Sequence, residues 1–213
     1  MLTTQALIIF AKLPRAGHVK TRLGKAIGMS AAAEIYKLFA EHAFTLGRQL
    51  LKKEIKVYVF YDPPASVDEV RTWVGPLFRL IPQEGTTLGD RMRRAFEYTF
   101  ATGSSRTIII GTDVPELDLL TLESAFVRLG KDDVVVGPSS DGGYYLLGMN
   151  APTKELFDGV HWSSESVFHE TIERLHRLNL SFAELAELAD IDTISDYRAY
   201  QDRTRDVKHR RDP

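Results

Sequence analysis

The sequence contains no cysteine, which excludes disulfide bonds, thiolate metal sites and a cysteine nucleophile. It also lacks any apolar run that approaches the roughly 20 residues of a transmembrane helix. No basic segment followed by an apolar one marks a signal peptide at the N-terminus. These absences lead us to expect a soluble, cytoplasmic protein with no membrane span.

Excess charge is missing as well. The formal net charge is -2, whereas a general nucleic-acid binder is normally basic overall, so we expect no nucleic-acid partner. The chain has no internal repeat, low-complexity tract or Gly/Ser linker. Its 213 residues suffice for one large domain. We therefore expect a single domain over residues 1–204 and a polar C-terminal tail over residues 205–213.

Short apolar segments alternate with longer amphipathic ones along the chain. The runs Ile108–Ile110 and Val134–Val136 have no polar alternation, which is typical of strands buried on both faces. We expect strands at Ala6–Ala11, Ile55–Tyr61, Phe78–Ile81, Thr107–Gly111, Val134–Gly137 and Tyr144–Gly148. We expect helices at about Ser30–Lys53, Ser66–Val74, Leu88–Ala101, Leu117–Leu129, Ser163–Leu178 and Ser195–Asp202. This alternation predicts an α/β fold, with a Rossmann-like, mostly parallel sheet and helices on both faces.

The longest predicted helix begins with a recognisable pattern. Ser30 is suited to cap it, and an apolar stripe follows through Ile35, Leu38, Phe39 and Phe44. The stripe predicts one face buried against the sheet.

A basic loop follows the first predicted strand. The loop has neither a Walker P-loop nor a Gly-x-Gly-x-x-Gly motif. An anion site must therefore depend on Lys12, Arg15, Lys20 and Arg22, with backbone N–H groups near Gly17. Loops of this kind lie at the carboxyl edge of the sheet, where α/β folds bind ligands. A polyphosphate would fit there, and a solvated basic loop is the alternative.

Asp113 follows the strand Ile108–Ile110 and belongs to the same predicted edge. A carboxylate beside a polyphosphate site is suited to hold Mg²⁺ or Mn²⁺, which prefer oxygen ligands and often bridge few carboxylates to phosphates. The alternative is that Asp113 caps the next helix.

Two further segments place carboxylates near this edge. Asp190 and Asp192 alternate on an extended segment, so they share one face and repel each other unless a cation lies between them. Asp192 or Thr193 as the cap of the last helix is the alternative. Asp141 lies in the Gly-rich turn Gly137–Gly148, where Asp141 as a plain turn former is the alternative.

Two loops offer weaker candidates. The segment Gln83–Met92 opens a helix and is suited to reach a base or sugar, with Arg91 the best candidate; an ordinary loop is the alternative. In the segment His161–Glu165 we favour Ser163 as a helix cap over a substrate contact. The other histidines have no paired spacing that would suggest a metal site.

Taken together, these segments resemble a known family. The motifs are Phe10–Pro14 with Gly17, Lys20–Leu23, Leu88–Met92, Gly111–Pro115, Gly137–Tyr144, Trp162–Ser163 and Asp190–Thr193. The chain is similar to the bacterial glycosyltransferase-like family, also called selenodomain-associated transferases. That family belongs to the nucleotide-diphospho-sugar transferase (glycosyltransferase-A-like) superfamily. It is similar to 2-phospholactate guanylyltransferase and the molybdenum-cofactor guanylyltransferases.

The resemblance implies a nucleotide site with a divalent metal, Mg²⁺ or Mn²⁺, on the phosphates. It places Lys12, Lys20 and Arg22 at the phosphates, and the metal at Asp113 and at Asp190 or Asp192. Gly89 and Arg91 lie in another of the shared motifs. The sequence Asp113–Pro115 is not the Asp-x-Asp of many glycosyltransferases, so nucleotidyl transfer stays open beside glycosyl transfer.

We therefore expect a metal-dependent transferase whose donor is a nucleotide-sugar or a nucleoside triphosphate and whose acceptor is a small molecule. Lys20 and Arg22 would neutralise charge on the departing phosphate, and Asp141 would contact the acceptor. A non-catalytic nucleotide-binding protein on the same fold is the alternative. The oligomeric state stays open.

Overall fold

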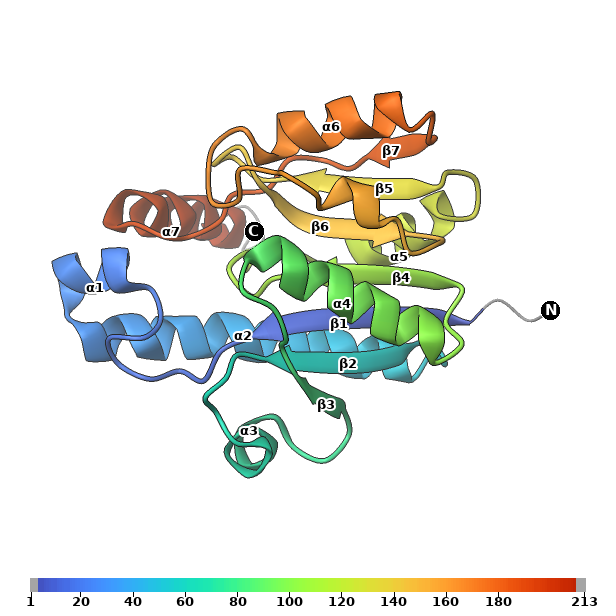
Figure 1. Cartoon of the computed structure of the whole chain (residues 1–213). Coiled ribbons are helices and arrows are strands. Elements are labelled where there is room, and N and C mark those ends of the chain that lie inside the picture. The colour runs from blue at the N-terminus through green and yellow to red at the C-terminus, as the bar shows by residue number, and fades with distance from the viewer. Residues whose placement is uncertain (1–3, 210–213) are drawn as a thin grey trace.

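The computed structural model describes residues 4–209, and within them the chain forms one seven-stranded sheet covered by helices on both faces (Figure 1). The elements are β1 (Gln5–Ala11), α1 (Thr21–Ile27), α2 (Met29–Leu51), β2 (Lys56–Tyr61), α3 (Val67–Val74), β3 (Arg79–Pro82), α4 (Leu88–Ala101), β4 (Arg106–Ile110), α5 (Leu119–Arg128), β5 (Val134–Pro138), β6 (Tyr144–Met149), the 3₁₀ turn η1 (Lys154–Leu156), α6 (Val167–Arg177), β7 (Phe182–Glu184) and α7 (Ile194–His209).

The strand order is β3-β2-β1-β4-β6-β5-β7. The strand β6 pairs antiparallel with both β4 and β5, and every other pairing is parallel. The sheet is therefore mixed but mostly parallel, which confirms the predicted fold class. Because β1, β4 and β5 run in the same direction, the segments that follow them meet at one edge of the sheet.

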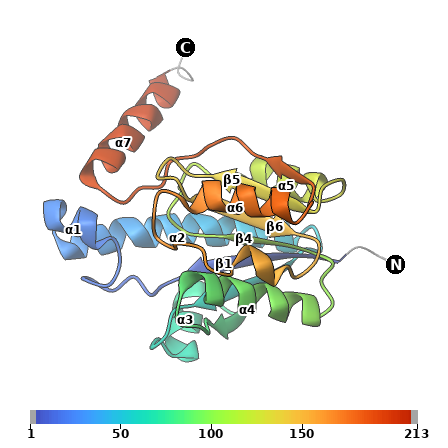
Figure 2. The same ribbon diagram turned by 45° about the horizontal axis from the view of Figure 1, so that its top comes forward.

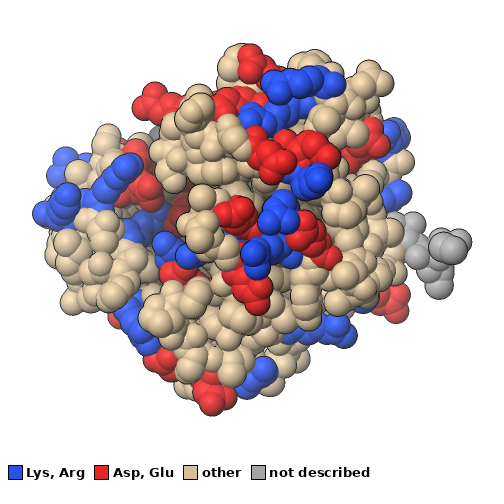
Figure 3. Space-filling model, in the orientation of Figure 1, with Lys and Arg blue, Asp and Glu red and all other residues tan. Residues whose placement is uncertain are grey.

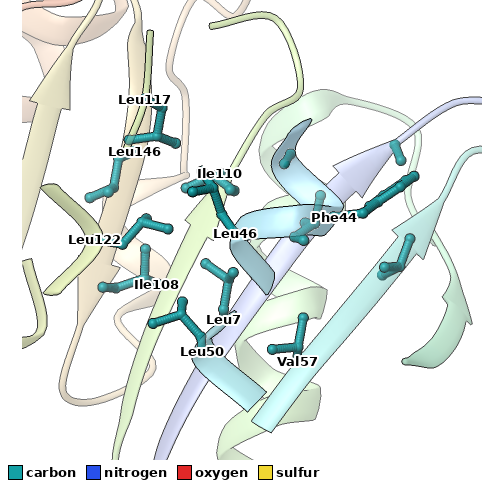
Figure 4. Packing of buried hydrophobic residues seen from close by; sticks show 14 of the residues in the cluster. Leu7, Phe44, Leu46, Leu50, Val57, Ile108, Ile110, Leu117, Leu122 and Leu146 are labelled. Atoms are coloured by element: carbon teal, nitrogen blue, oxygen red, sulfur yellow. The ribbon is translucent and has the colours of Figure 1, made fainter. Parts of the chain in front are cut away.

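Alternation along the central strands sends side chains into two cores. Leu7 and Ile9 of β1 belong to the core beneath α2, α3 and α5, whereas Ala6 and Ile8 belong to the core beneath α4 and α6. Figure 4 shows the first core, where residues of α2 pack over β1, β2 and β4. Burial on both faces explains the unbroken apolar runs of these strands.

The predicted helix α4 matches the observed one, while other boundaries differ. The prediction that Ser30 caps α2 is wrong: the helix begins after Gly28, whose φ of 95° turns the chain sharply out of α1. Leu38, placed in the buried stripe, is 65% exposed. The prediction that Ser163 caps α6 is also wrong, since Ser163 has a φ of 66° and the helix begins after Ser166.

Three elements were not predicted: α1, β7 and η1. The helix α7 runs to His209, so it includes part of the segment expected to be a polar tail, and residues 210–213 lie outside the described residues. Figure 2 shows α7 projecting from the body of the molecule, near α1. Among the described helices, none combines the length and apolar character that crossing a bilayer requires.

Candidate active site

An open cleft of about 1360 Å³ lies at the carboxyl edge of the sheet. Its walls come from the β1–α1 loop, the end of β4, the β5–β6 turn, the loop before α6 and the segment before α7. Figure 3 shows basic side chains gathered over α1 on this side of the molecule, with acidic side chains among them. Most predicted site residues line the cleft: Lys12, Lys20, Arg22, Arg91, Asp113, Asp141, Asp190 and Asp192.

Lys20 lies between two carboxylates from distant parts of the chain. Its Nζ atom is 2.6 Å from Oδ1 of Asp113 and 2.7 Å from Oδ1 of Asp192. The Lys20 side chain is 2% exposed, while both carboxylates are nearly half exposed to the cleft. Burial alone would lower the pKa of Lys20, but the two carboxylates outweigh burial and raise it. The chain therefore builds a fixed positive charge into the floor of the cleft.

The backbone at Lys20 has an unusual conformation. Its φ of 45° and ψ of 43° place it in the left-handed region, directly before α1 begins at Thr21. A residue with a Cβ atom adopts this region at a cost of roughly 1–2 kcal/mol. Such strain is found where the surrounding structure holds a side chain in place, and here the side chain is the buried ammonium group.

Neither carboxylate partner of Lys20 is needed as a helix cap. The N-cap of α5 is Asp118, which accepts a hydrogen bond from the Thr121 N–H. At the start of α7, the Thr193 side chain accepts a hydrogen bond from the Asp196 N–H, and Asp196 accepts from the backbone N–H groups of Asp192 and Thr193. Asp113 and Asp192 therefore have no capping role, whereas Thr193, the other residue considered as the cap of the last helix, does cap it.

A second acidic group lies beside this cluster. Asp190 is half-buried, and burial together with the nearby charges of Asp141 and Asp192 raises its pKa to about 6. Oδ1 of Asp141 accepts hydrogen bonds from the Ser139 hydroxyl at 2.5 Å and from the Gly143 N–H at 2.9 Å. Asp141 thus forms the turn, as its alternative suggested, and also lines the cleft.

The predicted phosphate residues separate into two groups. Lys12 and Arg22 are exposed and line the cleft. Arg15 does not line it, because its guanidinium pairs with Glu69 at the start of α3. Gly17 adopts a φ of 78° in the same loop, which glycine tolerates at low cost.

The two predicted residues of α4 differ in role. Arg91 lines the cleft, and its guanidinium is held by an ion pair with Asp62 and by a 3.2 Å hydrogen bond to Gln83 Oε1. Gly89 is not a lining residue; it lies against atoms Nε1, Cε2 and Cζ2 of the Trp162 indole, since a Cβ at this position would be 2.3–2.6 Å from them.

Sequence reasoning missed Tyr36, and Trp162 entered it only as part of a motif. Tyr36 is buried, and its hydroxyl oxygen accepts hydrogen bonds from the Lys12 N–H (2.8 Å) and the Thr112 hydroxyl (3.1 Å). It therefore ties the ends of β1 and β4 together. A tyrosine inside an apolar helical stripe resembles an ordinary core residue, so only the three-dimensional contacts reveal this role. Burial raises its pKa, which keeps the hydroxyl protonated.

Asp113, Asp190 and Asp192 could hold a divalent cation only together with further ligands, such as the phosphate oxygens of a substrate. Within residues 4–209, no group of three or more acidic, histidine or cysteine side chains has a geometry that would by itself hold a metal ion. Their chemistry nevertheless fits, because carboxylate oxygens suit Mg²⁺ and Mn²⁺, and Mg²⁺ in particular is commonly held by one or two carboxylates plus substrate phosphates. Asp190, crowded by two like charges, has the electrostatic environment that a bound cation would relieve.

The family comparison matches residues 45–164 to the model described as "Uncharacterized protein conserved in bacteria (DUF2064)". The comparison with curated proteins gives no match. A solved structure named "putative nucleotide-diphospho-sugar transferase", from Desulfovibrio desulfuricans G20, is 30% identical, with a TM-score of 0.87. The match covers 92% of this chain and 85% of the other.

Two more distant structures share the fold. CMP:2-keto-3-deoxy-manno-octonic acid synthetase complexed with CTP is 12% identical, with a TM-score of 0.55 over 97% of this chain and 99% of the other. Rv0371c from Mycobacterium tuberculosis H37Rv, in complex with manganese, is 15% identical, with a TM-score of 0.55. The match covers 92% of this chain and 97% of the other. These likenesses show that the chain has the nucleotide-diphospho-sugar transferase fold.

Proposed function

This chain belongs to the DUF2064 family, and from that premise and the geometry of its cleft we propose that it is a metal-dependent transferase whose donor is a nucleotide-sugar or a nucleoside triphosphate. The comparisons support a transferase-like enzyme in general terms, since a structure named "putative nucleotide-diphospho-sugar transferase" and a CMP-sugar synthetase are among its structural neighbours. The observation that carries the finer proposal is the buried Lys20, held between Asp113 and Asp192 on the floor of the cleft.

The cationic wall is suited to a diphosphate. Lys12 and Arg22 extend into the cleft beside Lys20, and hydrogen bonds to charged groups contribute about 1.5–3 kcal/mol each. Two or three such contacts would contribute about 3–9 kcal/mol, a large part of the roughly 8 kcal/mol that corresponds to micromolar binding. The neighbour solved with CTP supports the proposal that this wall receives nucleotide phosphates.

Asp113, Asp190 and Asp192 would hold Mg²⁺ or Mn²⁺ together with those phosphates. A bound divalent cation would supply Lewis-acid stabilisation of the charge on the phosphates. The Rv0371c neighbour, solved in complex with manganese, supports a metal in this fold. Lys20 would hold Asp113 and Asp192 in place through its two ion pairs until the donor arrives.

The residues of the chain act by position and charge. In a nucleotidyl transfer, an acceptor oxygen attacks the α-phosphorus and pyrophosphate departs. In a glycosyl transfer, an acceptor oxygen attacks the anomeric carbon and a nucleoside diphosphate departs. In either reaction Lys20 and Arg22 would offset the negative charge on the departing phosphate, while Asp141 would contact the acceptor.

Product analysis tests the proposal. The protein is incubated with Mg²⁺ or Mn²⁺, a panel of nucleoside triphosphates and nucleotide-sugars, and mixed small-molecule acceptors. Pyrophosphate release would identify a nucleotidyltransferase, and nucleoside diphosphate release a glycosyltransferase. Asp113→Asn should lose metal-dependent turnover, while Asp158→Asn, which changes an exposed carboxylate that does not line the cleft, should retain it.

Binding without turnover would favour the alternative of a non-catalytic nucleotide-binding protein. If no panel member is turned over or raises the melting temperature, the transferase proposal is wrong. Unchanged metal-dependent nucleotide affinity in Asp113→Asn would exclude Asp113 as a metal ligand.

A further inference from the structure

One wall of the cleft carries an aromatic ring that has no part in the proposed binding of nucleotide phosphates and metal. Trp162, in the loop before α6, is partly buried and lines the cleft. On one side it stacks on Phe157, with the ring centroids 6.2 Å apart and the planes 19° from parallel. The ring also lies against Gly89, where a Cβ would be 2.3 Å from the indole. The indole is therefore fixed before any ligand binds.

The second tryptophan shows what a purely structural indole looks like. The Trp73 N–H donates to Glu41 at 3.2 Å, and its ring packs edge-on against Phe44 at 5.0 Å. The Trp162 Nε1–H, in contrast, donates to no acceptor among residues 4–209. It is also not fully buried. Unlike the Trp73 indole, the Trp162 indole is therefore not held by a hydrogen bond of its own N–H within the described residues.

The backbone beside Trp162 is held in a costly conformation. Ser163 has a φ of 66°, in the left-handed region that residues with a Cβ atom rarely adopt. The following segment is docked on the β5–β6 turn: the Phe168 N–H donates to the Gly142 carbonyl at 2.9 Å, and Gly142 packs against the backbone of Glu165 so closely that no side chain would fit. Strain maintained by such packing is typical of ligand sites.

The rim of this wall is polar. Ser163, Ser164 and Glu165 are exposed and line the cleft next to the indole. The Ser164 hydroxyl is already engaged with the His161 carbonyl at 2.6 Å, whereas the Glu165 carboxylate has no ion pair among the described residues. The Trp162 indole offers a flat apolar surface, with the Glu165 carboxylate and the Ser163 hydroxyl at its edge. Such a surface suits a ligand ring that has C–H bonds on its face and hydroxyl groups around its edge.

The position of the wall separates it from the cationic loop. Lys12, Lys20 and Arg22 come from the β1–α1 region, whereas Trp162 belongs to the loop before α6, and both segments line the cleft. Figure 1 shows the first segment running from β1 to α1 and the second beside the start of α6. The cleft volume exceeds the roughly 300–1,000 Å³ of a pocket for one drug-sized ligand, so the cleft has room for a group beyond the phosphates.

We propose that Trp162, backed by Phe157 and rimmed by Ser163 and Glu165, forms the subsite for the hydroxyl-rich sugar ring next to the nucleotide phosphates. This inference rests on the proposed function. The sugar ring is part of the donor in a glycosyl transfer, and it is part of the product in a nucleotidyl transfer whose acceptor is a sugar phosphate. The ring face lies on the indole, and its hydroxyl groups donate to the Glu165 carboxylate.

Tryptophan fluorescence provides the test. Trp73→Phe leaves Trp162 as the single tryptophan, and Trp162→Phe leaves Trp73 as the matched control. Both proteins are titrated, with Mg²⁺, with the matched pairs UTP and UDP-glucose, GTP and GDP-mannose, and CTP and CDP-glucose, while calorimetry measures binding. A nucleotide-sugar should change the emission of Trp162, its matched triphosphate should bind without doing so, and Trp73 should not respond to either.

Affinity provides a second readout. Trp162→Ala should raise the Kd of a bound nucleotide-sugar about tenfold or more, leave that of the matched triphosphate within about twofold, and be largely rescued by Trp162→Phe. Equal responses of Trp162 to both members of a pair would assign the ring to the base and overturn the proposal. A nucleotide-sugar that binds without changing Trp162 emission, or triphosphate binding with no nucleotide-sugar binding, would overturn the subsite alone. Binding of no nucleotide to any variant would overturn the proposed function and the subsite with it.

Discussion

The Nζ atom of Lys20 lies 2.7 Å from Oδ1 of Asp192, a residue 172 positions later in the chain. The contact joins the start of α1 to the segment that leads into α7. The same ammonium group also binds Asp113 at the end of β4. One buried charge therefore connects three segments that the sequence separates widely, and it does so on the floor of the cleft.

Lys20→Met should weaken nucleotide binding about tenfold to a hundredfold, because the positive charge beside the phosphates is lost and two carboxylates are left facing the anionic ligand. Calorimetric titration with the triphosphates of the panel measures the effect. Lys25→Met, which changes an exposed lysine of α1, is the matched control and should bind normally. An unchanged Kd in Lys20→Met would contradict the phosphate role.

Tyr36→Phe should destabilise the fold by about 1–3 kcal/mol, since it removes the acceptor of the Lys12 N–H and the Thr112 hydroxyl in a buried setting. Urea unfolding measures the change in the free energy of unfolding. Tyr98→Phe is the control, because the Tyr98 ring is 38% exposed and its hydroxyl has no hydrogen bond within the described residues. If both variants unfold alike, the link between β1 and β4 through Tyr36 contributes little.

Glu170 anchors the loop that carries Trp162. Its carboxylate accepts hydrogen bonds from the Ser166 hydroxyl (2.7 Å) and His161 Nδ1 (2.9 Å), and these contacts lower its pKa to about 2. A carboxyl group with a lowered folded-state pKa stabilises the fold above its ordinary pKa of 4.5 and loses that contribution as the pH falls towards 2.

Glu170→Gln should therefore lower the melting temperature at pH 7, and the difference from the parent protein should shrink between pH 4.5 and pH 2. Thermal unfolding across this range is the measurement. Glu173→Gln, on the same helix and more exposed, serves as the control. A difference that persists unchanged to the lowest pH would mean that the ionised carboxylate of Glu170 is not what stabilises the loop.

Gly89→Ala should move the Trp162 indole, because the added Cβ would lie 2.3 Å from the ring. Alanine has the higher helix propensity, so α4 itself should not suffer. In the Trp73→Phe background, the emission of Trp162 should shift to longer wavelength and the protein should be destabilised. Adding Trp162→Phe should reduce the stability cost of Gly89→Ala, and additive costs would show that the two positions do not interact.

Local patterns predicted much of the fold. The Leu88–Ala101 helix was predicted at its observed bounds, and the structure shows a capping box of Thr87 and Asp90 at its start. Strands β4 and β5 were predicted from their runs of β-branched residues, which are typical of strands buried on both faces of a sheet. The helix α1 was missed because it follows a left-handed lysine with no side-chain cap, and its Gly24 is required by close contact with Met29. The strand β7 has only three residues, which is too short to show the alternation of apolar and polar residues that marks a strand.

The sequence by itself determined the fold class, the carboxyl edge and the residue types available there, because alternation, helical periodicity and charge are local properties of the chain. Only the tertiary structure decided which of these residues meet. In the folded chain Arg15 pairs with Glu69, and Lys20 lies between Asp113 and Asp192. Trp162 lies against Gly89. Contacts of this kind depend on how separate elements pack against one another, and no local pattern encodes the distance between segments far apart in the chain.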